Sequence, residues 1–225
     1  GWDVNKQIEA IDELEKSGCK AFVLCSVESD LIRKKIDELT EKGYPVVLLN
    51  NDLPGSKRLC FVGPDYLKSG RVAATMVDKC RQNTPLKILV VVGYKEHLGH
   101  KTRVEGFISE LKTRRSDFEI VDVIEGKDQD IITQQVTMKA FLAHPEINVV
   151  YMATGSGVSG LGAAIIADAV HQRFVVACDE IYTTKELVKN DIIDFVICQS
   201  PVVQGYQVIK KLHDYLNKIG TQPED

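Results

Sequence analysis

The feature that most constrains the fold of this chain is an alternation of short β-branched runs with segments of helical periodicity. Eight runs bounded by turn residues are predicted strands: Ala21–Cys25, Val46–Asn50, Leu59–Val62, Ile88–Val92, Ile120–Ile124, Val149–Ala153, Phe174–Cys178 and Phe195–Cys198. Most are almost uninterrupted in apolar residues, as expected when helices cover both faces of a parallel sheet. The pattern therefore predicts an α/β fold with doubly wound parallel sheets.

The segments between these runs carry apolar residues three or four positions apart, which predicts helices. They are Val4–Lys16, Leu31–Leu39, Val72–Cys80, Val104–Leu111, Ile132–Leu142, Leu161–Val170, Thr184–Val188 and Val203–Leu216. In such sheets functional side chains follow the carboxyl ends of strands. The chain opens on a helix and closes after one, so we expect it to be cut from a longer protein whose sheet has further members.

Charge and hydropathy exclude several functions for the segment itself. Its 225 residues include 28 Lys and Arg against 32 Asp and Glu, and the basic residues are scattered, which argues against direct nucleic-acid binding. No stretch of about 18 apolar residues is present, so no membrane span is expected. Residues 1–10 do not resemble a signal peptide, so the sequence gives no support for export.

The six cysteines show no metal-binding spacing, and we expect neither a metal nor a cofactor. Cys25, Cys60, Cys178 and Cys198 lie in or beside apolar runs, where a free thiol behaves as a small hydrophobic side chain. We interpret them as reduced core residues. That interpretation favours a cytoplasmic location.

Residues Gly155–Gly160 match the pattern GxGxxG between a predicted strand and a predicted helix, and Asp179 ends the next strand. This is the outline of a dinucleotide-binding fingerprint. Two observations weigh against it: the motif falls late in the chain, and no set of catalytic partners follows it. Glycine is also common wherever a strand turns into a helix at a ligand cleft.

Several segments, in their order along the chain, resemble the LacI-type regulators and the ribose-type sugar-binding proteins, which share the periplasmic-binding-protein-like type I fold. The segments are DVNKQIEAIDELEKSGCKAFVLCS, GYPVVLLNND, FVGPDYLKSGRVAATMV, KTRVEGFISEL, LAHPEINVVYMATGSGVSGLGAA, VVACDE and DFVICQSPVVQGYQVIKKL. The resemblance covers essentially the whole chain. It implies two α/β lobes with a ligand cleft between them.

On this map, residues 1–64 and 200–225 form the N-terminal lobe and residues 65–199 form the C-terminal lobe. The first strand-helix-strand unit of the family is missing from the N-terminal lobe. In regulators a helix-turn-helix headpiece precedes that unit, and it is missing as well.

The resemblance also implies ligand-binding residues in the cleft. Asp179 and Arg103 fall on the aspartate and arginine of the family's sugar site, whose side chains suit paired hydroxyl groups. For Asp179 the alternative is a helix N-cap near Tyr182, and for Arg103 it is an exposed ion pair with Glu105. Gln199 falls on a glutamine at the crossover between lobes, where a hinge hydrogen bond is the alternative.

Four more positions fall on the cleft with weaker signals. Asn50 stands where many relatives have aspartate, but Asn50 or Asn51 is equally suited to a turn before Pro54. Ser26, Asp128 and Ser156 are residue types that are common in loops and helix caps. Asp65 begins a helix, and a capping role is expected for it.

Two departures from the family pattern affect the expected ligand. Ser156-Gly157 replaces a frequent Asn-Asp pair, and Cys178 stands where an aromatic residue often precedes the cleft aspartate. The cleft loses a stacking surface on this side. We expect a smaller, less planar or more polar ligand than a simple pyranose, or stacking from the missing N-terminal unit.

The leading hypothesis is the effector-sensing domain of a LacI-type regulator, a cytoplasmic homodimer that binds a sugar-like effector and contacts operator DNA only through the missing headpiece. The alternative is a periplasmic or extracellular sugar-binding protein of an ABC transporter, with the same fold and site. A helix-turn-helix or a signal peptide upstream would discriminate between them. An NAD(P)-dependent oxidoreductase is the third hypothesis, and we predict that the chain is not an enzyme.

Overall fold

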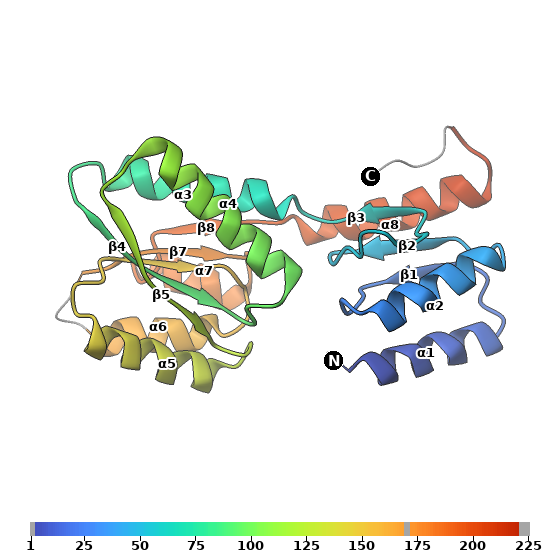
Figure 1. The fold of residues 1–225 in the computed structure, drawn as a ribbon, viewed down its shortest axis with the longest axis horizontal. Helices are drawn as coiled ribbons and strands as arrows, with labels where there is room; N and C mark the ends of the chain where they lie inside the picture. Colours follow the sequence, from blue (N-terminus) through green and yellow to red (C-terminus); the bar gives the residue numbers. More distant parts are fainter. Residues whose placement is uncertain (1–2, 169–171, 221–225) are drawn as a thin grey trace. The chain divides into compact units, whose positions relative to one another are not determined.

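The computed structural model describes residues 3–168 and 172–220, and the chain divides into two compact units (Figure 1). Unit 1 comprises Gly1–Pro64 and Ser200–Asp225, and unit 2 comprises Asp65–Gln199. Each unit has its own parallel sheet. Among the described helices, none combines the length and the apolar character that crossing a bilayer requires.

Unit 1 is a three-stranded parallel sheet with helices on both faces. The strands β1 (Phe22–Leu24), β2 (Val46–Leu49) and β3 (Cys60–Val62) lie side by side in that order. The helices α1 (Val4–Lys16) and α2 (Asp30–Glu41) pack on one face, and α8 (Pro201–Leu216) contributes Val208 to the cluster on the other. Phe22 and Leu24 of β1 therefore face α1 and α2, while Val23 between them faces the α8 side.

Unit 2 is built on a five-stranded parallel sheet in the order β5-β4-β6-β7-β8. Its elements are α3 (Tyr66–Cys80), β4 (Leu86–Val92), α4 (Leu98–Arg114), β5 (Phe118–Glu125), α5 (Asp130–Ala143), β6 (Val149–Met152), α6 (Val158–Ala167), β7 (Phe174–Cys178), α7 (Tyr182–Lys189) and β8 (Phe195–Ile197). In Figure 1 the pair α3 and α4 covers one face of this sheet, and the pair α5 and α6 covers the other.

The helices α3 and α4 approach each other at two glycines. A Cβ atom on Gly70 of α3 would lie 2.0 Å from the Arg103 carbonyl oxygen of α4, and one on Gly106 of α4 would lie 2.2 Å from the Leu67 carbonyl oxygen of α3. Side chains at these positions would push the helices apart. This contact fixes the backbone that carries Arg103.

The strand order reverses direction between β4 and β6, because the chain runs from β4 to β5 on one side and continues from β6 to β8 on the other. At such a reversal the loops at the carboxyl ends of the two central strands diverge and leave a crevice for a ligand. In unit 2 this point lies beside Gly93, which follows β4, and Ala153, which follows β6.

The predicted fold class is confirmed, and every predicted strand and helix has its counterpart. The strand ends differ by up to two residues: the predicted strand at Ile88–Val92 begins at Leu86, and the one at Ile120–Ile124 spans Phe118–Glu125. The helix predicted over Leu161–Val170 spans Val158–Ala167, and Val170 lies outside the described residues.

The prediction that four cysteines are core residues is wrong for two of them. Cys60 and Cys178 are buried within strands, but Cys25 and Cys198 follow the last residues of β1 and β8 and are exposed. An apolar run in a short strand buries side chains only while the chain lies between the helix layers. The residue after the strand has already left that layer.

Candidate functional site

Polar side chains follow the carboxyl ends of several strands, and three of the predicted site residues among them have a left-handed backbone. The φ angles are 64° at Asn50 after β2, 54° at Asp128 after β5 and 72° at Asp179 after β7. Aspartate and asparagine tolerate this region better than other non-glycine residues, but it is still sparsely populated. Backbone strain of this kind persists where the surrounding structure enforces it, and it is concentrated at functional sites.

Three of the predicted residues meet at one carboxylate in unit 2. Arg103 Nη2 donates to Asp179 Oδ1 at 3.3 Å, and Gln199 Nε2 donates to the same oxygen. Arg103 Nη1 also donates to the Ala153 carbonyl oxygen at 2.9 Å, which ties the guanidinium to the end of β6. The structure therefore brings together side chains that are up to 96 positions apart in the sequence.

Arg103 is the buried support of this group. Its side chain is 3% exposed, against 26% for Asp179, and its guanidinium carbon lies 4.9 Å from the ring centroid of Tyr66. The alternative of an exposed ion pair with Glu105 is excluded by this burial. Asp179 and Gln199 are only partly buried, so Arg103 orients the Asp179 carboxylate from behind.

The alternative role of Asp179 as a helix cap is also excluded. The N-cap of α7 is Ile181, which makes no side-chain capping bond, and Thr184 Oγ1 donates to the backbone oxygen of Asp179, not to its carboxylate. Gly155 lies against this carboxylate, because a Cβ on Gly155 would be 2.4 Å from Asp179 Oδ2. The side chain is thus held by Arg103 and Gln199 and is available for a further partner.

A fourth predicted residue, Asp128, follows β5, on the other side of the reversal in strand order from Asp179. Thr154 Oγ1 donates to Asp128 Oδ1 at 3.2 Å and accepts from the Ser156 backbone N–H at 3.2 Å. Ser156 is exposed, and its hydrogen bond in this group comes from its backbone. Burial raises the pKa of Asp128, and the hydrogen bond from Thr154 opposes that effect.

Two histidines near this carboxylate, His97 and His100, pack against each other, which the sequence did not indicate. The rings of His97 and His100 lie 4.3 Å apart, and His100 Nδ1 lies 3.2 Å from the Tyr94 carbonyl oxygen. Burial is the main cause that lowers the pKa of each to about 4; at His97 the neighbouring His100 also lowers the pKa and the Asp128 carboxylate raises it. Both rings are therefore neutral at physiological pH.

Thr154 was missed by the sequence reasoning, although it follows the β6 apolar run in the position where Asp179 follows β7. Its hydroxyl joins Asp128 to the loop of Ser156.

The remaining predicted residues, Ser26 and Asn50, belong to unit 1. Asn51 Nδ2 donates to the Ser26 backbone oxygen at 3.4 Å, so the carboxyl ends of β1 and β2 are linked. Ser26 is 2% exposed, its hydroxyl is buried, and no hydrogen-bond partner for that hydroxyl is found among the described residues. The side chain that reaches Ser26 is thus that of Asn51, while the Asn50 backbone N–H donates to the Val62 carbonyl oxygen at 2.9 Å.

The glycine motif at residues 155–160 is explained by packing. Gly155 makes room for Asp179, Gly157 has a φ angle of 83° at the N-cap of α6, and a Cβ on Gly160 would lie 1.9 Å from the Asp130 backbone oxygen. The Gly160 N–H donates to Asp130 Oδ1 at 3.4 Å. These roles account for the motif without a dinucleotide.

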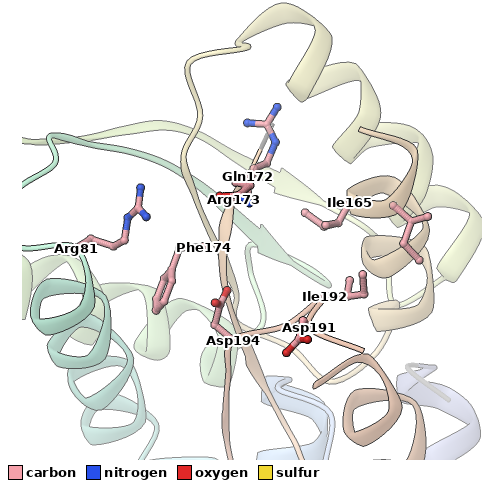
Figure 2. A pocket seen from close by; sticks show the side chains of 9 residues that line it. Arg81, Ile165, Gln172, Arg173, Phe174, Asp191, Ile192 and Asp194 are labelled. Carbon is pink, nitrogen blue, oxygen red and sulfur yellow. The ribbon is translucent and has the colours of Figure 1, made fainter. Parts of the chain in front are cut away.

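A cavity of about 570 Å³ lies at the amino-terminal ends of strands in the unit 2 sheet, away from the carboxyl ends that carry Asp179 and Gln199 (Figure 2). Phe174, the first residue of β7, and Asp194, which precedes β8, line it, with Arg81 from the end of α3 on one side and Asp191 on the other. The predicted residues Asp179 and Gln199 follow the other ends of these two strands, so this cavity is separate from the candidate site. Within residues 3–168 and 172–220, no group of three or more histidine, cysteine or acidic side chains is placed to hold a metal ion.

The chemistry of the unit 2 group suits a polyhydroxylated ligand. A carboxylate accepts from two hydroxyl groups, and an amide both donates and accepts. Planar groups of this kind, held by a buried arginine, are preorganised, so less side-chain entropy is lost on binding.

Comparison with known proteins places these features in a family. The family model described as "Periplasmic binding protein domain" matches residues 1–221. A search of curated proteins gave no match.

Solved structures resemble the whole chain. An ABC transporter solute-binding protein from Burkholderia graminis, solved in complex with D-arabinose, has a TM-score of 0.92 at 17% identity, over 99% of this chain and 78% of that one. The arabinose-binding protein AraP from Geobacillus stearothermophilus has a TM-score of 0.83 at 22% identity, over 99% and 76% of the two chains. A periplasmic ribose ABC transporter protein from Conexibacter woesei has a TM-score of 0.87 at 24% identity, over 99% and 74%. At these identities the likeness concerns the fold.

Proposed function

Because the chain belongs to the family of periplasmic binding protein domains, we propose that it binds a monosaccharide as part of a solute receptor that serves an ABC transporter. The observation that carries this proposal is the Asp179 carboxylate, oriented by Arg103 and Gln199 at the carboxyl edge of the unit 2 sheet. The similar solved structures support it, since those named above are sugar-binding or solute-binding proteins of ABC transporters.

The same comparisons favour the transporter receptor over the LacI-type regulator, which the sequence pattern put first. The operator DNA, the homodimer and the cytoplasmic location belonged to the regulator hypothesis and stay predictions without support from the comparisons. To explain the site, the receptor hypothesis requires a bound ligand but no operator DNA and no headpiece. It is therefore the simpler account of the site.

In this proposal the side chains have distinct roles. Asp179 accepts hydrogen bonds from vicinal hydroxyl groups, and the Gln199 amide adds a donor and an acceptor beside it. Arg103 is a positioning residue: it donates a hydrogen bond to the Asp179 carboxylate and holds it in place. Ser26 and Asn50 of unit 1 stay ligand contacts that only the family resemblance predicts.

The proposal is tested by calorimetric titration of the protein with D-arabinose, D-ribose, D-xylose, D-glucose and D-galactose. We expect at least one of them to bind and Asp179→Asn to weaken that binding at least tenfold, because a lost hydrogen bond to a charged group costs about 1.5–3 kcal/mol. The matched control is Arg81→Gln, which removes a charge from the cavity of Figure 2 and should leave the affinity within twofold. Equal effects of the two substitutions, or no binding of any monosaccharide, would contradict the proposal.

A further inference from the structure

Asp128 has no structural role that explains its carboxylate. It lies between β5 and α5, but the N-cap of α5 is Gln129, and no side chain caps that helix. Among the described residues, the hydrogen-bond donor to Asp128 is the Thr154 hydroxyl at 3.2 Å. A partly buried carboxylate that neither caps a helix nor closes an ion pair is costly to keep, and such groups occur at functional sites.

Three features of the fold hold this carboxylate in place. Gly93 leaves the space it occupies, since a Cβ on Gly93 would lie 2.0 Å from Asp128 Oδ1. Lys127 and Asp128 both have left-handed backbone angles, with φ of 53° and 54°. Because β4 lies between β5 and β6 in the sheet, the side chain reaches Thr154 only by passing over Gly93. The carboxylate is thus presented at the point where the strand order reverses.

The cationic groups nearby do not balance its charge. The Arg103 guanidinium pairs with Asp179. Burial lowers the pKa of both His97 and His100 to about 4, although the Asp128 carboxylate raises that of His97, so these rings are neutral near pH 7. Lys127 is exposed, and within the described residues no ion pair joins it to Asp128. Arg103 and Asp179 offset each other, and the site keeps one negative charge.

Asp128 and Asp179 flank the same short stretch of chain. Asp128 contacts Thr154, and Asp179 lies against the next residue, Gly155. Both carboxylates thus lie beside the two residues that follow Ala153, at the carboxyl ends of the unit 2 strands.

We infer that Asp128 receives a basic group of the ligand, so that the substrate class of this site is an amine-bearing monosaccharide or aminated polyol. This inference rests on the proposed sugar-binding function. In it, Asp179 takes a hydroxyl pair, as for a neutral sugar, and Asp128 takes the ammonium group. The ammonium supplies both the hydrogen-bond donors and the positive charge that Asp128 lacks.

The test compares each neutral sugar with its amine at pH 6.5 by calorimetric titration: D-glucose with D-glucosamine, and D-galactose with D-galactosamine. We expect at least one amino sugar to bind tenfold or more tightly than its neutral counterpart. Its N-acetyl derivative, which has no charge, should lose this advantage. Asp128→Asn keeps the shape and the bond from Thr154, and it should reduce the preference for the amine to less than twofold.

Two controls separate the inference from a general electrostatic effect. Asp191→Asn removes a carboxylate of the same unit at the opposite edge of the sheet, and it should leave the preference unchanged. The melting temperature of Asp128→Asn, measured without ligand, should not fall, because the substitution removes a buried charge without a counter-charge. A fall of several degrees would give Asp128 a structural role and overturn the inference.

The outcomes distinguish the two proposals. If neutral sugars bind as tightly as the amines, or if Asp128→Asn keeps the preference, the inference is overturned and the sugar-binding function stands. If neither the amino sugars nor any of the five neutral monosaccharides named above binds, the proposed function fails, and the inference fails with it.

Discussion

Replacing Gly70 by alanine tests how the helix that carries Arg103 is positioned. The new Cβ would lie 2.0 Å from the Arg103 carbonyl oxygen and 2.8 Å from the Phe107 backbone nitrogen, whereas real Cβ contacts are essentially never shorter than 3.0 Å. Both neighbours are backbone atoms of α4, so the helix itself must shift by about 1 Å to restore a normal contact. No side-chain rotation relieves this clash.

The magnitude follows from two opposing terms. Overpacking of this kind costs about 1–3 kcal/mol, and a clash with backbone belongs at the upper end. Alanine regains about 0.5–1 kcal/mol of helix propensity over glycine. We therefore expect a net loss of about 2 kcal/mol, which at a urea m-value of about 2 kcal/mol/M lowers the midpoint by about 1 M.

The assay is urea unfolding followed by circular dichroism, with Gly205→Ala as the matched control. Gly205 lies in the interior of α8, and nothing lies within 4 Å of a Cβ placed there, so this substitution should stabilise the protein. The two variants make the same chemical change in a helix and are expected to shift the free energy of unfolding in opposite directions. A Gly70→Ala protein as stable as the parent would refute the close approach of α3 and α4.

Two further predictions concern single side chains in unit 2. Asp65→Ala should lower the free energy of unfolding by about 0.5–2 kcal/mol, because the Asp65 carboxylate caps α3 by accepting from the Lys68 N–H. Urea titration measures this loss. Full recovery of stability in Asp65→Ser would identify the cap as the cause. Stability should also fall as the pH drops from about 6.5 towards 4, because the pKa of His100 is about 4 in the folded protein and about 6.5 in the unfolded chain, which therefore binds the proton first. His100→Gln should reduce this change in the free energy of unfolding with pH by at most about 3 kcal/mol. The control His213→Gln, at an exposed histidine, should leave it unchanged. If the parent and both variants have the same pH profile of unfolding free energy, the protonation of His100 is not coupled to folding.

The strands and helices could be predicted because their signals are local. A run such as Val149–Met152 is apolar throughout because both faces of its sheet are covered, and the predicted capping of α3 by Asp65 is confirmed. The cysteines show the limit of the same argument. Cys25 and Cys198 follow apolar runs as closely as Cys178 does, yet only Cys178 lies within a strand.

The site was only partly predictable, because its contacts depend on the strand order. Asp179 and Gln199 stand at strand ends, where the sequence draws attention to them, and the family resemblance pointed to Arg103. The burial of Arg103 behind Asp179 and the passage of Asp128 over Gly93 depend on which strands are neighbours. The order of the strands in the sheet cannot be inferred from the spacing of these residues or from their types.

The order β5-β4-β6-β7-β8 also determines when in folding the site comes into existence. Arg103 and Asp179 are 76 residues apart, and the Gln199 donor comes from the last strand at one edge. Closing loops of this length costs chain entropy before any contact repays it, so these pairings form late. A partly folded or nascent chain therefore offers no binding site, and a ligand will protect only molecules in which all five strands of unit 2 have assembled.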